Sequence, residues 1–342
     1  MARSLTDDGA HRSAVVGIDE AGYGPLLGPL VVSAVVFDVP MTIMQGLKDV
    51  AAGPDLWALL RASVAPKSGR RDARLAVADS KKLYGQRGSA RGVTLLERAA
   101  LTFLALADEP PATLHSMLGL LCPEVIDKLR HYPWYADTDV ALPTVVTHDD
   151  LATQRNALLS DLAATGIRFR GVWSEVLPEG HFNRLVANTH NKAVVLFGLT
   201  VRLIQRIADD LGPRPLRVWV DRQGGRTGYR RPLMTAFEDA RLEVVEESRE
   251  RSSYRLTRRT APWMVRFVQK GESHHLPIAL ASIFSKYLRE LLMGCFNRYW
   301  TVHVPDLRPT GGYYQDGQRF LSDIGGAVSR LGVQREWLVR SL

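Results

Sequence analysis

The sequence has little cysteine and no long uninterrupted apolar segment. Only Cys122 and Cys295 occur among 342 residues, which excludes a disulfide framework and a zinc site built on several cysteines. The longest apolar run, 26–37, is interrupted by Gly28 and Pro29 and is too short to cross a bilayer. Residues 1–13 are polar and lack the apolar stretch of a signal peptide; we expect them to be disordered. These absences predict a cytoplasmic protein without membrane association.

Positive charge exceeds negative charge. The chain has 44 Lys and Arg against 36 Asp and Glu, a formal net charge of +8, and most of the excess lies after residue 200. Such a balance favours polyanionic partners such as nucleic acid. An ordinary solvated basic surface has the same composition, so charge alone leaves both interpretations open.

Strands and helices alternate along the chain. Apolar, β-branched runs predict strands at 14–18, 30–37, 216–220, 242–245 and 264–269. Helical spacing of apolar residues predicts helices at 56–65, 94–107, 124–130, 149–164, 183–211, 231–240 and 277–293. This interleaving predicts an α/β fold with a mixed central sheet flanked by helices.

Acidic residues stand at the ends of three predicted strands. Asp19 and Glu20 close the first strand, Asp221 closes the strand at 216–220, and Glu272 follows the strand at 264–269. Carboxylates gathered at strand ends repel one another unless cations neutralise them. Hard divalent cations such as Mg²⁺ or Mn²⁺ prefer oxygen ligands, and two such ions can clamp a phosphodiester for attack by water. Taken singly, an acidic residue at a strand end is more often a turn or cap residue than a metal ligand.

Five ordered segments resemble the ribonuclease HII family. They are 17–25 (GIDEAGYGP), 79–83 (DSKKL), the strand that ends at Asp221, the pair 270–273 (KGES) and 281–286 (ASIFSK), and 311–316 (GGYYQD). The resemblance extends from Val15 to about Leu321 and is interrupted by insertions.

The resemblance implies a ribonuclease H-like fold and a division of the chain. Residues 14–83 and 180–300 would form the catalytic core, 84–179 a mostly helical insertion, and 301–342 a C-terminal, helical, substrate-binding portion. It also implies endonucleolytic hydrolysis of the RNA strand of RNA/DNA hybrids with two Mg²⁺ or Mn²⁺ ions, leaving 5′-phosphate and 3′-hydroxyl ends. We expect a monomer.

The resemblance also assigns roles by position. Asp19, Glu20, Asp221 and Glu272 match the catalytic, metal-binding carboxylates. Gly22 and Gly24 match a loop whose backbone contacts 2′-hydroxyls, and glycine permits such close approach. The other matched substrate-binding positions are Tyr23, Lys81, Lys82, Lys286 and Tyr313.

Two departures from the family pattern leave alternatives open. Tyr23 stands where the family has arginine, in a loop that helps recognise a single ribonucleotide embedded in DNA. Glu272 stands where the family usually has aspartate, and the longer side chain shifts the carboxylate by about 1 Å. The alternatives to a hybrid-cleaving nuclease are a weakened paralogue that only binds nucleic acid, and a nuclease for another structured or DNA substrate.

Three further features have more than one interpretation. The arginine-rich segment 249–259 is either a phosphate-contacting strip or a solvated β-hairpin. His274 and His275 either assist a metal or a proton transfer, or are polar loop residues. The segment 84–179 could form a helical cap, a partner surface or a substrate clamp.

Overall fold

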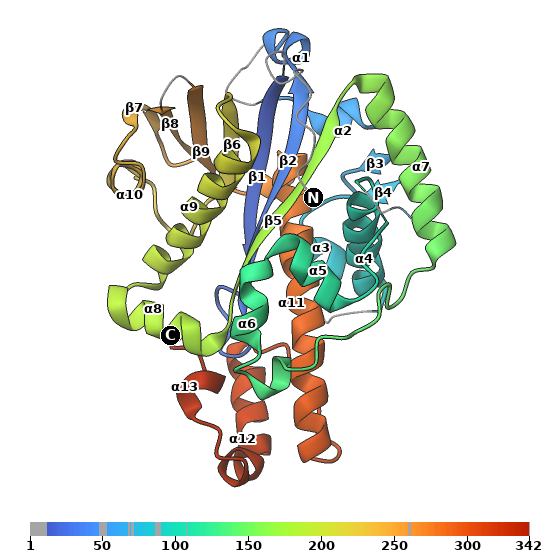
Figure 1. The fold of residues 1–342 in the computed structure, drawn as a ribbon, viewed down its shortest axis with the longest axis vertical. Coiled ribbons are helices and arrows are strands. Elements are labelled where there is room, and N and C mark those ends of the chain that lie inside the picture. Colours follow the sequence, from blue (N-terminus) through green and yellow to red (C-terminus); the bar gives the residue numbers. More distant parts are fainter. Residues whose placement is uncertain are drawn as a thin grey trace.

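A seven-stranded mixed sheet lies at the centre of the molecule, with strand order β5-β2-β1-β6-β9-β8-β7. The computed structural model describes residues 12–47, 53–67, 69, 72–85, 90–107, 109–258 and 261–341. Helices cover both faces of the sheet (Figure 1), so the predicted α/β class is confirmed. The strands are β1 (Arg12–Ala21), β2 (Leu30–Pro40), β5 (Arg168–Leu177), β6 (Leu216–Asp221), β7 (Arg241–Glu247), β8 (Arg251–Arg258) and β9 (Ala261–Val268).

The helices divide between the two faces of the sheet. On one face lies α9 (Lys192–Leu211); on the other lie α11 (Leu276–His303) and α4 (Ala90–Leu104). No described helix is long and apolar enough to cross a membrane. The other helices are α1 (Met41–Gln45), α2 (Leu56–Leu59), α3 (Ser80–Tyr84), α5 (Leu114–Leu121), α6 (Ile126–Leu129), α7 (His148–Thr165), α8 (Glu179–Thr189), α10 (Arg230–Ala236), α12 (Tyr314–Arg330) and α13 (Arg335–Leu338).

Strands β1 and β2 are buried on both faces because their side chains alternate. Val15 and Val31 belong to the core beneath α11, whereas Val16 and Val32 belong to the core beneath α9. Strands buried on both sides have continuous apolar sequences, which is why both could be recognised from sequence.

Three strands end at the same edge of the sheet. β1 runs parallel to β6, with Ile18 opposite Val220, and β6 runs parallel to β9, with Asp221 opposite Val268. Parallel neighbours point their carboxyl ends in one direction, so the residues that follow them meet.

Two predicted helices were wrong in extent. The helix expected at 183–211 is two helices, α8 and α9, because His190 takes a left-handed conformation with φ of 51°. The helix expected at 56–65 ends at Leu59, and Val64–Ala65 forms the short strand β3, which pairs with β4 (Leu75–Ala76).

The segment 84–179, expected to be mostly helical, also contributes a strand to the sheet. It contains α4 to α7, but its last element is β5, an edge strand that pairs antiparallel with β2. Strand β5 begins with the exposed Arg168 and the partly exposed Arg170 and Gly171, so its sequence lacks a clear apolar pattern. Of the residues expected to be disordered, 1–11 lie outside the described residues, while Arg12 and Ser13 belong to β1.

Glu97 ties the helices of this segment to α11. Its buried carboxylate accepts hydrogen bonds from the backbone nitrogens of Thr144, Val145 and Val146, at 2.9, 2.6 and 2.9 Å, and from the hydroxyl of Tyr287 at 2.7 Å. Burial alone would raise the pKa of Glu97, but these donors lower it. The carboxylate therefore stays charged and fixes the segment against the main helix of the fold.

Gly17 lets α11 approach β1 closely. A Cβ atom at this position would lie 2.2 Å from the carbonyl carbon of Pro277 and 2.3 Å from the nitrogen of Ile278. Both are backbone atoms of the first turn of α11, so neither can move aside without displacing the helix.

We predict that Gly17→Ala destabilises the protein by about 1–3 kcal/mol or more, because overpacking against backbone forces the helix outward. Urea denaturation measures this effect. The matched control is Gly198→Ala in α9, where an added Cβ meets nothing within 4 Å; it should raise stability by up to about 1 kcal/mol. Unchanged stability of Gly17→Ala would contradict the close approach.

Candidate active site

The four predicted carboxylates come from three elements that end side by side. Asp19 and Glu20 lie at the end of β1, Asp221 is the last residue of β6, and Glu272 lies in the short turn 271–273 between β9 and α11. The structure brings all four together, since each of Asp19, Glu20 and Asp221 feels the negative charge of Glu272 and of at least one other member.

Burial makes this cluster electrostatically costly. Desolvation, followed by repulsion from neighbouring carboxylates, raises the pKa of Asp19, Glu20 and Asp221. The neighbouring Glu272 carboxylate adds to the rise in the pKa of Asp221. The cluster therefore retains protons unless a cation replaces them.

Fixed donors orient two of the carboxylates. The backbone nitrogen of Gly271 donates to Oδ1 of Asp221 at 2.7 Å. The Ser282 hydroxyl hydrogen-bonds to the Asp19 carboxylate, and Ser285 donates to the Asp19 carbonyl oxygen at 3.0 Å. Sequence analysis gave these serines no role, although both lie in the 281–286 segment and their spacing puts them on one face of α11.

The donor chemistry fits hard divalent cations. All four groups offer carboxylate oxygens, and Oε2 of Glu272 is buried without a hydrogen-bond partner. Within the described ranges, however, no group of three or more His, Cys, Asp or Glu side chains is arranged to hold a metal ion. The residues fit a cation by chemistry, burial and charge.

Of the three predicted lysines, Lys81 is the one whose ammonium group interacts with the carboxylates of the cluster. Burial would lower the pKa of its ammonium group, but Asp19, Asp79 and Glu20 raise it. Lys82 is 71% exposed and lies 3.8 Å from Asp79.

Lys286 has other partners. Its Nζ lies 2.6 Å from Oε1 of Glu290 and 4.3 Å from the centre of the Tyr84 ring. Lys286 therefore contacts a carboxylate and a ring outside the cluster of four.

The β1–β2 loop requires glycine at one of its two predicted positions. Gly22 has φ of 86°, and a Cβ there would lie 2.5 Å from the carbonyl oxygen of Pro29 and 2.6 Å from Nε of Arg289. A Cβ at Gly24 would meet nothing within 4 Å. Close packing explains why glycine is needed at position 22. Gly24 has no such constraint, and its backbone is exposed.

Two buried arginines hold this loop from beneath, and sequence analysis identified neither. Arg289 of α11 donates to the carbonyl oxygens of Leu27 and Gly311 at 3.0 and 3.1 Å. Arg340 donates to the carbonyl oxygens of Gly22 and Tyr23, the latter at 3.1 Å. A single arginine in a short tail carries no recognisable pattern, so no signal in the sequence could have revealed Arg340.

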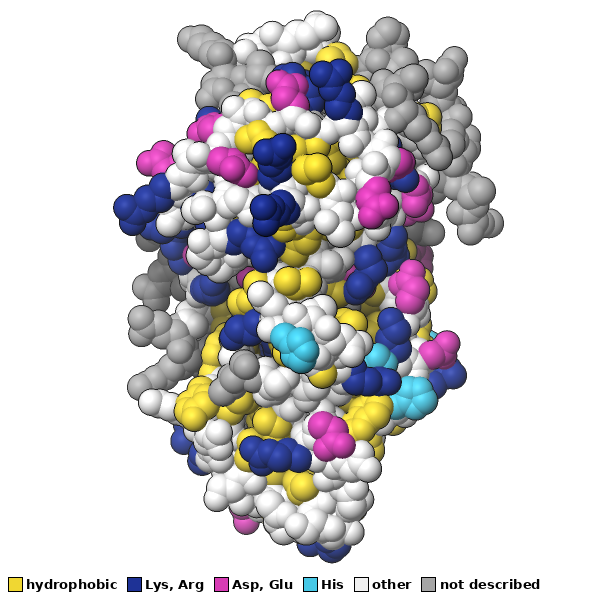
Figure 2. All heavy atoms as spheres, turned by 90° about the vertical axis from the view of Figure 1, so that its left-hand side faces the viewer, with side chains coloured by type: hydrophobic (Ala, Val, Ile, Leu, Met, Phe, Trp, Pro, Cys, Tyr) yellow, Lys and Arg dark blue, Asp and Glu magenta, His cyan; other side chains and the backbone are white. Residues whose placement is uncertain are grey.

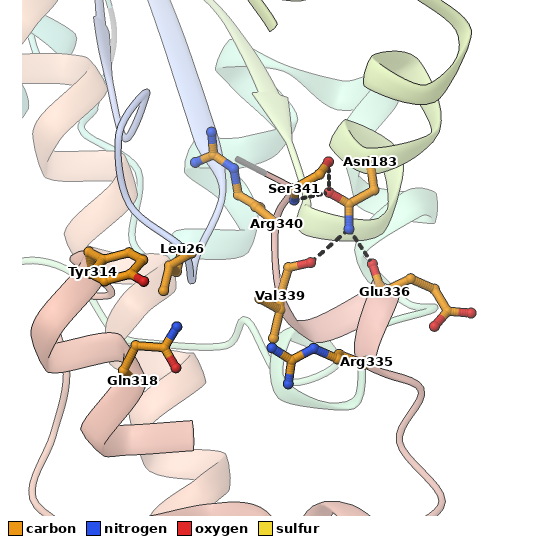
Figure 3. Close-up of a pocket in the computed structure, with 9 residues that line it drawn as sticks. All are labelled: Leu26, Asn183, Tyr314, Gln318, Arg335, Glu336, Val339, Arg340 and Ser341. Atoms are coloured by element: carbon orange, nitrogen blue, oxygen red, sulfur yellow. Dashed lines mark hydrogen bonds between the residues drawn. The ribbon is translucent and has the colours of Figure 1, made fainter. Parts of the chain in front are cut away.

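The C-terminal segment is anchored so that Arg340 can reach the loop (Figure 3). Nδ2 of Asn183 donates to the carbonyl oxygens of Glu336 and Val339 at 2.7 Å each, and its Oδ1 accepts from the nitrogen of Ser341 at 2.7 Å. Beside this segment lies an open cavity of about 550 Å³, lined by Leu26, Asn183, Tyr314, Gln318, Arg335, Glu336, Val339, Arg340 and Ser341.

The two predicted tyrosines have different cationic neighbours. Tyr313 is 55% exposed, and the Arg289 guanidinium lies 6.0 Å from its ring centre. Tyr23 is partly exposed, and Lys192 lies 5.3 Å from its ring centre. Both rings are accessible from solvent beside the carboxylates or the loop next to them.

The arginine-rich segment and the histidines also have defined surroundings. Arg251, Arg255 and Arg258 of β8 form ion pairs with acidic residues of β7 and of the turn before it, at 2.7, 2.7 and 2.6 Å, which favours the β-hairpin interpretation. His275 lies 5.4 Å from the ring centre of Trp219, and burial lowers its pKa to about 4. His275 is therefore neutral at neutral pH and packs beside Trp219, which neither of the two interpretations of the sequence included.

We predict that the metal-free protein loses stability as pH rises from about 5 to 8. The folded-state pKa values of Asp19, Glu20 and Asp221 are raised, so the unfolded chain releases their protons first and folding is penalised at higher pH. Saturating Mg²⁺ or Mn²⁺ should restore stability, by about 2.7 kcal/mol at a hundred times Kd. Thermal denaturation at both pH values measures this, and Asp19→Asn should weaken both effects. Equal metal stabilisation at pH 5 and 8 would contradict the charge argument.

Comparison with known proteins gives short sequence matches and weak structural ones. No family model matches the chain. It is 52% identical over 40 residues to ribonuclease HII of Xylella fastidiosa, which is 12% of this chain and 17% of that protein. It is 56% identical over 39 residues to ribonuclease HII of Rickettsia akari, which is 11% of this chain and 20% of that protein. The chain thus spans about a fifth of the length of these relatives.

Solved structures of low similarity cover most of the chain. A mutant of Bst-RNase HIII has a TM-score of 0.44 and 14% identity, covering 97% of this chain and 66% of that chain. Ribonuclease H2 from Pyrococcus horikoshii has a TM-score of 0.41 and 13% identity, covering 95% of this chain and 92% of that chain. Over these short stretches the chain is similar in sequence to ribonuclease HII.

Proposed function

We propose that this protein is a metal-dependent endoribonuclease that hydrolyses the RNA strand of RNA/DNA hybrids. One observation carries the proposal: four carboxylates from separate parts of the chain converge at strand ends, where burial and then repulsion between carboxylates raise the pKa values of Asp19, Glu20 and Asp221. Carboxylates that are buried and repel one another add nothing to the stability of a protein, so a cluster of this kind indicates a functional site.

Asp19, Glu20, Asp221 and Glu272 would hold two Mg²⁺ or Mn²⁺ ions. When bound, such ions activate water and stabilise the departing oxygen of a phosphodiester. The protein's own groups fix the cluster: Ser282 holds the Asp19 carboxylate, and the Gly271 nitrogen holds Asp221. The reaction would leave 5′-phosphate and 3′-hydroxyl ends.

Groups around the cluster would bind the substrate. Lys81 would attract the phosphate, since its ammonium lies in the field of Asp19 and Glu20. Arg340 holds the Gly22 and Tyr23 carbonyls, and this loop backbone would lie against the 2′-hydroxyl that distinguishes RNA from DNA. The exposed ring of Tyr313 would stack on a sugar or base without reading sequence.

A second candidate function is binding without efficient cleavage. It is favoured by the side-chain arrangement of the cluster, since no described group of three acidic, histidine or cysteine side chains is set to hold a metal ion. Glu272 adds to this, because its longer side chain must be accommodated at a site where position determines rate.

We predict cleavage of a labelled RNA/DNA hybrid in Mg²⁺ or Mn²⁺, and loss of at least about a hundredfold in Asp19→Asn. Asp127→Asn is the matched control, because its side chain is 88% exposed on α6; its activity should equal that of the wild type. Parallel assays with a duplex carrying one ribonucleotide and with plain DNA identify the substrate class. Binding of the hybrid without cleavage in either metal would favour the second candidate instead.

We predict that Glu272→Asp lowers cleavage. Oε2 of Glu272 is buried, and its carboxylate lies near enough to Asp221 to raise that residue's pKa, so shortening the side chain withdraws the carboxylate by about 1 Å, which can cost up to about a hundredfold in rate. Initial rates at saturating hybrid measure the effect. A faster Glu272→Asp enzyme would mean that the natural glutamate impairs the site.

A further inference from the structure

Lys192, Tyr23 and Arg226 converge beside the carboxylates from three separate elements. Lys192 is the first residue of α9, and its ammonium lies 5.3 Å from the centre of the Tyr23 ring. Tyr23 follows Glu20 by three positions, and Arg226 follows Asp221 by five. Burial raises the pKa of the Tyr23 hydroxyl, Glu20 raises it further and Arg226 lowers it, so both charged groups lie in the neighbourhood of Tyr23.

Arg226 is held in place by aromatic rings. Its guanidinium lies 5.9 Å from the ring centre of Phe197 and 5.7 Å from that of Tyr229. Tyr229 is itself fully buried and stacked on Phe267, with ring centres 3.5 Å apart. The arginine therefore lies over a rigid apolar base and remains partly exposed.

These two cations differ from the other basic residues of this side of the molecule. Figure 2 shows Lys and Arg spread along the side that carries α9, α10 and β7. The arginines of β8 there are paired with carboxylates, as Arg255 is with Glu243 at 2.7 Å. In the part of the chain that the structure describes, no Asp or Glu forms an ion pair with Lys192 or Arg226.

We propose that Lys192 and Arg226, together with the Tyr23 ring, bind the phosphodiester backbone of the nucleic acid strand that enters the active site. The surface would take two phosphates, one for each cation, with the ring packing on a sugar or base of the same strand. This inference rests on the proposed function and names a part of its substrate-binding surface.

The chemistry favours a polynucleotide over a small anion. Two cations and an aromatic ring match the alternation of phosphates and bases along a polynucleotide strand. Both cations are partly exposed and lie along a surface, whereas a site for a small anion encloses its ligand. The positive end of the α9 dipole lies at Lys192 and adds to the attraction of a phosphate.

Binding in the non-cleaving Asp19→Asn background tests this surface. A fluorescent RNA/DNA hybrid is titrated at 50 to 300 mM KCl, and the slope of log K against log salt is measured by anisotropy. We expect the double substitution Lys192→Gln and Arg226→Gln to reduce the slope by about 2, and to weaken binding by roughly ten- to a hundredfold at the lower salt. The charge-conserving pair Lys192→Arg and Arg226→Lys should restore the slope.

The matched control is the double substitution of Lys128→Gln on α6 and Arg130→Gln directly after it, which removes the same charge from exposed positions of another part of the chain. An equal loss of slope in the control would overturn the proposal, since the effect would then be one of net charge. An unchanged slope in the Lys192 and Arg226 variant would also overturn it, while cleavage by the wild type would leave the proposed function intact. A protein that binds the hybrid without cleaving it would refute the nuclease assignment, and the slope would still decide the role of this surface. Absence of hybrid binding would overturn both.

Discussion

Repulsion among four carboxylates is the constraint on which the candidate site depends. Asp19, Glu20, Asp221 and Glu272 would separate if the chain allowed it, but β1, β6 and β9 end at one edge of the sheet and hold them there. Gly17 lets the first turn of α11 lie against β1, and this helix brings Ser282 to Asp19. The energy of packing two apolar cores thus opposes an electrostatic cost that only a cation or a proton relieves.

The loop beside the cluster is held by charge of the opposite sign. Arg289 and Arg340 are almost fully buried and donate to backbone carbonyls of the 22–28 loop or its neighbour. Glu179, also buried, accepts from the Gly28 nitrogen at 3.1 Å and from Tyr135 at 3.0 Å, and burial raises its pKa to about 7. The loop backbone is therefore fixed by α8, α11 and the C-terminal segment together, which is the preorganisation that a site reading a 2′-hydroxyl needs.

The sequence predicted those parts of the fold and site that leave a local pattern. Strands β1, β2, β6 and β9 are apolar runs, and acidic residues stand at the ends of β1 and β6 and four positions after β9, so both the sheet and its carboxylates could be found. Strand β5 could not, because its polar edge hides the pattern, and the break at His190 depends on a backbone conformation that composition does not reveal. Arg340 lies 318 positions from Gly22, and a contact at that separation follows from tertiary packing alone.

The basic excess of the chain illustrates why charge must be read from structure. Net charge alone could not separate a nucleic acid surface from ordinary solvated residues, and the arginine-rich segment 249–259 was the most basic candidate by sequence. In the fold, the arginines of β8 are neutralised by neighbouring acids, whereas Lys192 and Arg226, which no pattern marked, lie beside the carboxylates against aromatic rings. A cation with a partner has little electrostatic free energy left to give a phosphate, and a cation held in place without one retains most of it. The position of the unneutralised cations, more than their number, determines where a polyanion would bind.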